Sequence, residues 1–149
     1  MEITFNHRYK VINTIGKQGF STIYKVLEIK TKKFYALKFI AIVNNDKLKN
    51  FKEQYEKEIE VMKTINNKYI IELIDYFIVD NNGYCIVMEL CDCNLKEFLN
   101  KYKPNGLPIN TINKIFTQLN EALILMLENK YCHRNLKPEN ILQLLTITE

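Results

Sequence analysis

The sequence predicts an α+β fold in which an antiparallel sheet of five strands comes first and helices follow. Short apolar runs separated by turn residues fill most of residues 9–90, as expected of strands joined in hairpins. Apolar residues recur every three or four positions in residues 48–65 and 110–129, which is the spacing of amphipathic helices. With 149 residues, the chain is long enough to form one domain with a core.

The bulk composition is that of an ordinary globular protein, with 47% hydrophobic and 26% charged residues. The net charge of +4 is too small and too evenly spread to indicate nucleic acid or a membrane as a partner. The 4 cysteines include no C-x-x-C pair, so they predict reduced thiols in an intracellular protein and no zinc site. No signal peptide is evident, and the longest strongly apolar run, 122–127, cannot span a bilayer. We expect a cytoplasmic protein.

The first two strands are expected at Tyr9–Ile15 and Ile23–Ile29, joined by a mobile loop over Gly16–Ser21. By itself this pattern indicates only a hairpin. The third strand is expected at Phe34–Ile40, where alternation places the side chains of Ala36 and Lys38 on the same face. A lysine between apolar strand residues is otherwise most often a surface residue.

A helix is expected over Leu48–Ile65, capped from Asn44–Asp46, with Glu58 beside its apolar stripe. Ile70–Val79 and Tyr84–Leu90 then predict a hairpin turned at Asp80–Gly83. After a loop at 103–108, a second helix is expected over Asn110–Asn129. The second half of this helix is apolar nearly all round, so it must be buried on several sides. Its expected inward residues are Ile112, Ile115, Phe116, Leu119, Ala122, Leu123 and Met126.

Residues 131–142 form a loop that gathers polar side chains between apolar ends, and Pro138 prevents a helix from running through it. The loop resembles the catalytic loop of a protein kinase, H-R-D-L-K-P-E-N, with Asn135 in place of the aspartate. In the family this aspartate accepts the proton of the substrate hydroxyl, and the asparagine, here Asn140, holds magnesium. Lys137 is typical of the serine/threonine class. An amide can orient a hydroxyl but cannot take up its proton, so the resemblance implies impaired catalysis.

Four further segments are similar to kinase motifs and occur in the family's order. Gly16 matches the first glycine of the Gly-rich loop, whereas Gln18 and Ser21 replace the other two, with Gly19 between them. The resemblance implies that Lys38 contacts the nucleotide phosphates and pairs with Glu58. It places the nucleotide against Ile15, Gly16, Gly19, Ile23, Ala36, Lys38, the hinge residues Met88, Glu89 and Cys91, the ribose-contacting position Asn94, and Leu142.

The resemblance implies a partial protein kinase domain over residues 1–149, with a complete small lobe over about 9–90. The small lobe comprises the five-stranded sheet and the helix that the family calls αC. Residues 91–149 would hold the hinge, the first large-lobe helices and the catalytic loop. The chain contains no D-F-G, whose aspartate is the main magnesium ligand of the family, so magnesium binding at Asn140 is expected to be weakened or lost.

Three hypotheses follow from these motifs. The first is an active serine/threonine kinase, represented by a truncated chain, that transfers phosphoryl groups from ATP to protein hydroxyls. The second is a pseudokinase that binds a nucleotide or a partner protein, which Asn135, Gln18 and Ser21 together favour. The third is an unrelated α+β domain with chance motif matches, which does not explain why five motifs occur in the right order. Under the first two, the expected partners are ATP and a protein, with no nucleic acid or membrane.

Overall fold

The computed structural model describes residues 3–42, 48–65, 67–79 and 83–143. They belong to two compact units, the first made of Met1–Thr64 and Glu72–Leu90, the second of Ile65–Ile71 and Cys91–Glu149. Each unit contains its own cluster of buried side chains. The expected helix cap at Asn44–Asp46 and most of the expected turn at 80–83 lie outside the described residues.

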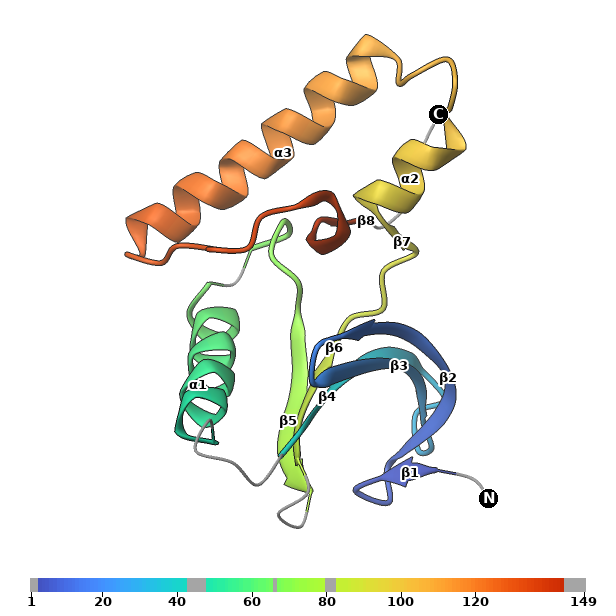
Figure 1. Cartoon of the computed structure of the whole chain (residues 1–149), viewed down its shortest axis with the longest axis vertical. Coiled ribbons are helices and arrows are strands. Elements are labelled where there is room, and N and C mark those ends of the chain that lie inside the picture. Colours follow the sequence, from blue (N-terminus) through green and yellow to red (C-terminus); the bar gives the residue numbers. More distant parts are fainter. Residues whose placement is uncertain (1–2, 43–47, 66, 80–82, 144–149) are drawn as a thin grey trace. The chain divides into compact units, whose positions relative to one another are not determined.

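The first unit contains one curled antiparallel sheet with the strand order β1-β2-β3-β4-β6-β5 (Figure 1). Its strands are β1 (Thr4–Phe5), β2 (Tyr9–Gln18), β3 (Ser21–Glu28), β4 (Phe34–Ala41), β5 (Leu73–Val79) and β6 (Gly83–Met88). The five expected strands are all present, and the sheet gains a short sixth strand because Phe5 pairs with Tyr9. The two residues of this strand are too few to show an alternating pattern. The expected strand start at Ile70 was wrong, because the Ile70 amide closes a turn onto the Asn67 carbonyl.

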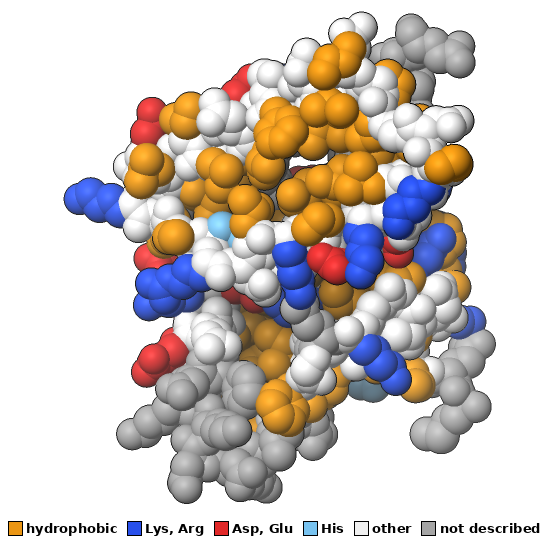
Figure 2. Space-filling model, turned by 45° about the horizontal axis from the view of Figure 1, so that its top comes forward, with side chains coloured by type: hydrophobic (Ala, Val, Ile, Leu, Met, Phe, Trp, Pro, Cys, Tyr) orange, Lys and Arg blue, Asp and Glu red, His pale blue; other side chains and the backbone are white. Residues whose placement is uncertain are grey.

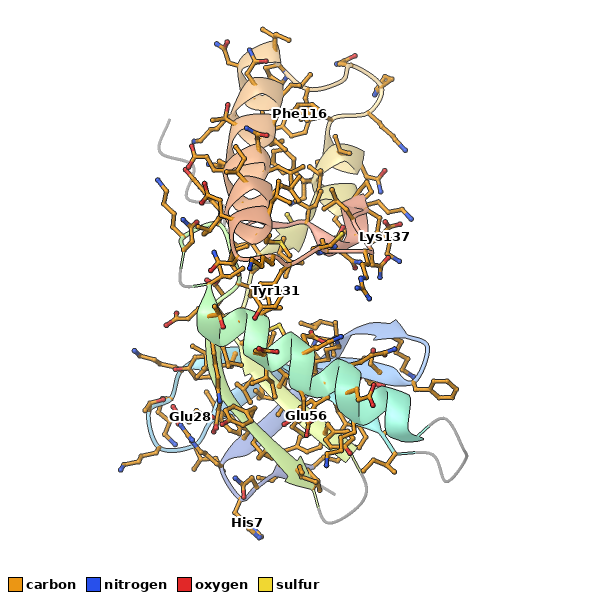
Figure 3. The ribbon with its side chains drawn as sticks, turned by 90° about the vertical axis from the view of Figure 1, so that its left-hand side faces the viewer. His7, Glu28, Glu56, Phe116, Tyr131 and Lys137 are labelled. Carbon is orange, nitrogen blue, oxygen red and sulfur yellow. The ribbon has the colours of Figure 1, made fainter. Side chains whose placement is uncertain are left out.

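The two faces of this sheet bury different side chains. The core cluster on one face comprises Tyr9, Val26, Leu37, Cys85 and Val87, all inaccessible to solvent. The other face is covered in part by α1 (Leu48–Thr64), which carries Glu56 and lies across the strands in Figure 3. The rings of Tyr55 and Tyr84, one from α1 and one from β6, lie 4.5 Å apart. Burial of such large apolar groups is what holds the helix on the sheet.

The turn between β2 and β3 is tighter than expected. Gln18 pairs with Ser21, so only Gly19 and Phe20 remain between the strands, and the expected six-residue mobile loop is not present. Gly19 has a φ of +57°, a conformation that glycine adopts without strain and that a two-residue type II′ turn requires at its first position. The two positions that lack the family's glycines therefore lie in paired strands.

An ionic network built around Arg8 ties the start of the first unit to its edge strand. The Arg8 guanidinium donates to Glu28 Oε1 at 2.6 Å and to Asp75 Oδ2 at 2.7 Å. The Tyr9 hydroxyl donates to the same Asp75 oxygen at 2.9 Å, and the Thr31 hydroxyl donates to Glu28 Oε2. Glu28 is only 4% exposed. A buried carboxylate is tolerated because it is hydrogen-bonded and paired with a cation.

This network makes the free energy of unfolding depend on pH in the acid range. Hydrogen bonds from Thr31 and then Arg8 hold the pKa of Glu28 below its usual value. Near and below that usual value the unfolded chain binds more protons at this position than the folded chain does. The stabilisation is therefore present above the usual pKa and is lost as pH falls through the lowered one. We expect the variant Glu28→Gln to show a flatter loss of melting temperature between about pH 5 and pH 3. A profile as steep as that of the unmodified chain would contradict this.

The second unit is built around two helices and a short strand pair. Its elements are α2 (Leu95–Lys101), α3 (Ile109–Glu128), the short 3-10 helix η1 (Pro138–Asn140), and the paired strands β7 (Cys93–Asn94) and β8 (Leu142–Gln143). A buried cluster of Cys93, Leu95 and Phe98 is joined by Leu107, Ile115 and Ile141. The second unit thus brings the ends of the hinge segment and of the 131–142 loop together.

Helix α3 leaves several large apolar side chains exposed. Ala122 and Met126 are buried as expected, but Phe116 is 65% and Leu127 is 74% exposed. The prediction for Phe116 was wrong because apolar residues surround much of this helix, so periodicity does not single out one buried stripe. Figure 2 shows hydrophobic side chains gathered over the part of the molecule where α3 lies. None of the helices in the described part of the chain is long and apolar enough to cross a membrane.

Candidate functional site

The first unit presents an ion pair between β4 and α1. Lys38 Nζ lies 2.8 Å from Glu58 Oε1 and 2.7 Å from Oε2, so the ammonium is held by both carboxylate oxygens. The Lys38 side chain is 25% and the Glu58 side chain 35% exposed, which leaves both accessible to a ligand. The pair expected from the sequence is therefore confirmed. An ammonium has three N–H donors, so one remains for a further acceptor.

The same face of the sheet carries apolar side chains next to this lysine. Ile23 lies opposite Lys38 on the neighbouring strand β3, and Met88 lies opposite Ala36 on β6. Residues directly opposite in an antiparallel pair, or two apart along one strand, share a face. Ile23, Ala36, Lys38 and Met88 therefore all project from the face on which α1 packs. An apolar surface beside a partly exposed cation is suited to a ligand with a flat ring and an anionic group.

The chain that follows β6 is held in place at Glu89. Its amide donates to the Glu72 carbonyl at 3.1 Å, and its carboxylate accepts from the Glu72 amide at 2.9 Å. These bonds fix the direction in which the chain leaves the sheet. In the second unit, Asn94 caps α2, with its side-chain oxygen accepting from the Glu97 amide at 2.9 Å. This oxygen therefore already accepts a hydrogen bond from the helix backbone. The expected contact of Asn94 with a ribose stays a prediction.

In the second unit the 131–142 loop is held by its own amide groups. The Asn140 side chain donates to the Asn135 carbonyl at 2.8 Å, and the Asn140 amide donates to the Lys137 carbonyl at 2.9 Å. The Asn135 amide donates to the His133 carbonyl at 2.7 Å. The loop thus links the three positions expected to act, because Asn140 is hydrogen-bonded to the backbone of both Asn135 and Lys137. The side chain of Asn135 itself is exposed.

A second ion pair, which the sequence did not predict, joins α2 to this loop. Lys96 Nζ lies 2.9 Å from Glu139 Oε1. The hydrogen bond from Lys96 holds the pKa of Glu139 below its usual value. The two residues are far apart along the chain, and each lies in a segment rich in charge, so no local pattern links them. Lys137, labelled in Figure 3, lies on the same loop.

The predicted site residues are divided between the two units. Ile15, Gly16, Gly19, Ile23, Ala36, Lys38, Glu58, Met88 and Glu89 belong to the first unit, whereas Cys91, Asn94, Asn135, Lys137, Asn140 and Leu142 belong to the second. Within the first unit the structure brings Lys38, Glu58, Ile23 and Ala36 to one face. Sequence reasoning missed the Arg8 network, although Arg8 is one of only two arginines in the chain.

This arrangement belongs to one class of protein. A family model described as protein kinase domain matches residues 9–146, nearly the whole chain. The curled antiparallel sheet, the helix packed on it and the lysine–glutamate pair are the features expected of the first part of such a domain. The chain therefore belongs to the protein kinase family.

Its curated relatives include serine/threonine and dual-specificity kinases. The chain is 30% identical over 145 residues to human serine/threonine-protein kinase tousled-like 2, covering 93% of this chain and 20% of that protein. It is 32% identical over 142 residues to the dual specificity tyrosine-phosphorylation-regulated kinase mbk-2 of Caenorhabditis elegans, covering 91% and 17%. For serine/threonine-protein kinase ppk15 of Schizosaccharomyces pombe the identity is 30%, with 91% and 26% covered. The chain thus spans about a quarter or less of these relatives.

The family implies magnesium, and the described residues fit only part of such a site. The Asn140 side chain uses its nitrogen to bond the Asn135 carbonyl, which leaves its oxygen, a ligand type that magnesium accepts. In the ranges that the structure describes, no group of three His, Cys, Asp or Glu side chains could hold a metal ion. One amide oxygen does not make a magnesium site.

Proposed function

We propose that this chain binds ATP on the α1-covered face of the first unit. The observation that carries the proposal is the placement of Lys38, held by both oxygens of Glu58, beside the apolar side chains of Ile23 and Ala36. The cation offers its remaining N–H to phosphate oxygens, while the apolar side chains offer a surface to the adenine ring. The contact of Leu142 with the adenine, which the family resemblance implies, stays a prediction.

We further propose a serine/threonine kinase-like domain whose phosphoryl transfer is impaired, with residues 9–90 as its small lobe. Asn135 can hold a protein hydroxyl by hydrogen bonding but cannot accept its proton. The carboxylate nearest in sequence, Glu139, is engaged by Lys96. The amide of Asn135 in place of a carboxylate also favours the second candidate, a pseudokinase that binds nucleotide or a partner protein without turnover. The expected cytoplasmic location stays a prediction.

The adenine surface is tested by enlarging Ala36. Ala36 is almost fully buried and lies directly opposite Met88, so a phenylalanine there would occupy the space proposed for the base. We expect Ala36→Phe to abolish binding of a fluorescent ATP analogue while far-ultraviolet circular dichroism shows a folded sheet. Ala36→Gly, which keeps the surface open, is the matched control and should bind. Equal affinity in Ala36→Phe and the unmodified chain would refute the assignment.

The catalytic proposal is tested by restoring the missing carboxylate. A general base contributes about 10²- to 10⁴-fold, but transfer also needs metal ions that neutralise charge on the phosphates. Because the described residues supply one partial magnesium ligand, we expect Asn135→Asp to give no more than a few-fold gain in phosphoryl transfer by the 149-residue chain. The assay follows label from γ-labelled ATP into a serine peptide with magnesium present. A gain of a hundredfold or more would place the limiting defect at Asn135 instead.

A further inference from the structure

Helix α3 carries a row of exposed side chains along one face. The row advances by four, three, four, four and three residues, which keeps its members on one side of a helix with 3.6 residues per turn. Four of the side chains are large and apolar. We call this row the α3 stripe, and its exposed members are Ile109, Asn113, Phe116, Asn120, Ile124 and Leu127. A contiguous apolar surface of this kind marks a site of interaction.

The α3 stripe is separate from the face of α3 that packs within the second unit. Ala122 and Met126 are buried, and Ile115 packs against the cluster of buried side chains around Phe98. These three positions lie about 120° or more around the helix from the middle of the stripe, at 100° per residue. Polar substitutions in the stripe therefore leave the packing of the second unit in place.

The two flanks of the α3 stripe differ in chemistry. On one flank the exposed Lys114, Glu121 and Glu128 follow each other at intervals of seven residues, so they form a second row beside the stripe. The cation lies in the first half of the helix and the two anions lie in the second half. On the other flank Ile112 and Leu119 are half-buried. The stripe thus has one charged flank, whose sign changes along the helix, and one apolar flank.

These flanks make α3 complementary to an antiparallel copy of itself. In an antiparallel pair related by a two-fold axis, each flank meets the same flank of the other helix, so charge faces charge and apolar faces apolar. When the two helices overlap along their full length, Lys114 of each copy lies within about one turn of Glu121 of the other. A parallel pair would set the charged flank against the apolar one and would align the helix dipoles unfavourably.

We propose that the α3 stripe joins two copies of this chain through an antiparallel pair of α3 helices. Helix α3 has 20 residues and is therefore about 30 Å long, which gives the pair an extended contact. The second copy supplies the same apolar side chains, so both copies cover Phe116 and Leu127 at once. Asn113 and Asn120 lower the stability of such a contact but restrict its register, because a buried amide needs a hydrogen-bond partner.

Sedimentation equilibrium of the 149-residue chain at increasing concentration measures this association. We expect a reversible change from one chain to two with no larger species, because a two-fold contact uses up the stripe of both copies. A mass of one chain at every concentration would overturn the proposal, and so would growth beyond two chains. A chain that stays monomeric and binds phosphatidylcholine vesicles through Leu127 would overturn it as well, because the stripe would then contact lipid.

Substitutions of exposed residues identify the surface that associates. Phe116→Ser and Leu127→Ser should each weaken the association at least about tenfold, because each removes apolar area from the stripe. Ile78→Ser is the matched control, since it removes a comparably exposed apolar side chain from β5 in the first unit and should leave the association unchanged. Circular dichroism checks that every variant is folded. An equal loss in Ile78→Ser would overturn the proposal.

A charge exchange tests the antiparallel arrangement. Lys114→Glu and Glu121→Lys should each weaken self-association about threefold or more at low ionic strength, because like charges then face each other in both halves of the pair. An equal mixture of the two variants should recover the lost affinity, since every glutamate of one variant then meets a lysine of the other. A mixture that associates no better than either variant alone would overturn the proposal.

Discussion

Replacing Lys38 with methionine should lower the affinity of the chain for ATP by at least about tenfold. A hydrogen bond to a charged group contributes about 1.5–3 kcal/mol, which corresponds to roughly a 10- to 100-fold change in affinity. The substitution also removes the cation that lies 2.7 Å from Glu58 Oε2. The Glu58 carboxylate then remains unpaired on the face proposed to receive phosphate. Its repulsion should add to the loss. Equilibrium titration with a fluorescent ATP analogue measures the change.

Two controls make this result specific. Lys33→Met removes the same charge from an exposed turn of the first unit and should leave ATP affinity unchanged. Glu58→Gln keeps the lysine but loosens its position, so its loss should be smaller than that of Lys38→Met. If Lys38→Met bound ATP as tightly as the unmodified chain does, the phosphates would not lie at Lys38.

The second large effect is expected at Arg8, whose replacement by methionine should lower the melting temperature by roughly 5 to 10 °C. Arg8 is the cation shared by Glu28 and Asp75. Without it the nearly buried Glu28 keeps only the Thr31 hydroxyl, and an uncompensated buried charge is strongly destabilising. Thermal unfolding followed by circular dichroism at neutral pH measures the shift.

A double substitution identifies the cause of that loss. Arg8→Met combined with Glu28→Gln removes both the cation and the charge it compensates, so it should recover part of the melting temperature lost in Arg8→Met alone. Arg8→Lys keeps the charge but lacks the planar fork that reaches two carboxylates, and should fall between the unmodified chain and Arg8→Met. A shift of less than 1 °C in Arg8→Met would show that the network contributes nothing measurable.

The order and type of the main elements could be predicted where apolar residues recur with the period of a strand or a helix. The alternation at 34–41 and the three-to-four spacing in α1 are visible in the local sequence, and the alternation places Ala36 and Lys38 on one face. Strand β1 shows no such pattern because it has only two residues. Gly83 was predicted as a turn residue, but a Cβ there would lie 2.4 Å from the Phe39 ring, so close packing also requires the glycine.

The site could be predicted only where a family motif fixes the residues. Lys38 and Glu58 were found in this way, although they are 20 positions apart. The Lys96–Glu139 and Arg8–Asp75 pairs span 43 and 67 positions and depend on how the chain folds back, which local periodicity does not encode. The exposure of Phe116 could not be predicted either. Helix α3 is apolar on several sides, so the spacing of its apolar residues does not indicate which side is buried.

The most direct test of ATP binding without transfer is equilibrium dialysis of the 149-residue chain against γ-labelled ATP with magnesium, followed by chromatography of the retained label. We expect about one label per chain at saturation, most of it retained as intact ATP after hours of incubation, because Lys38, held by Glu58, offers a phosphate contact while Asn135 cannot act as a base. No retained label would contradict ATP binding. Rapid accumulation of ADP, with label recovered in protein, would contradict the proposed impairment of phosphoryl transfer.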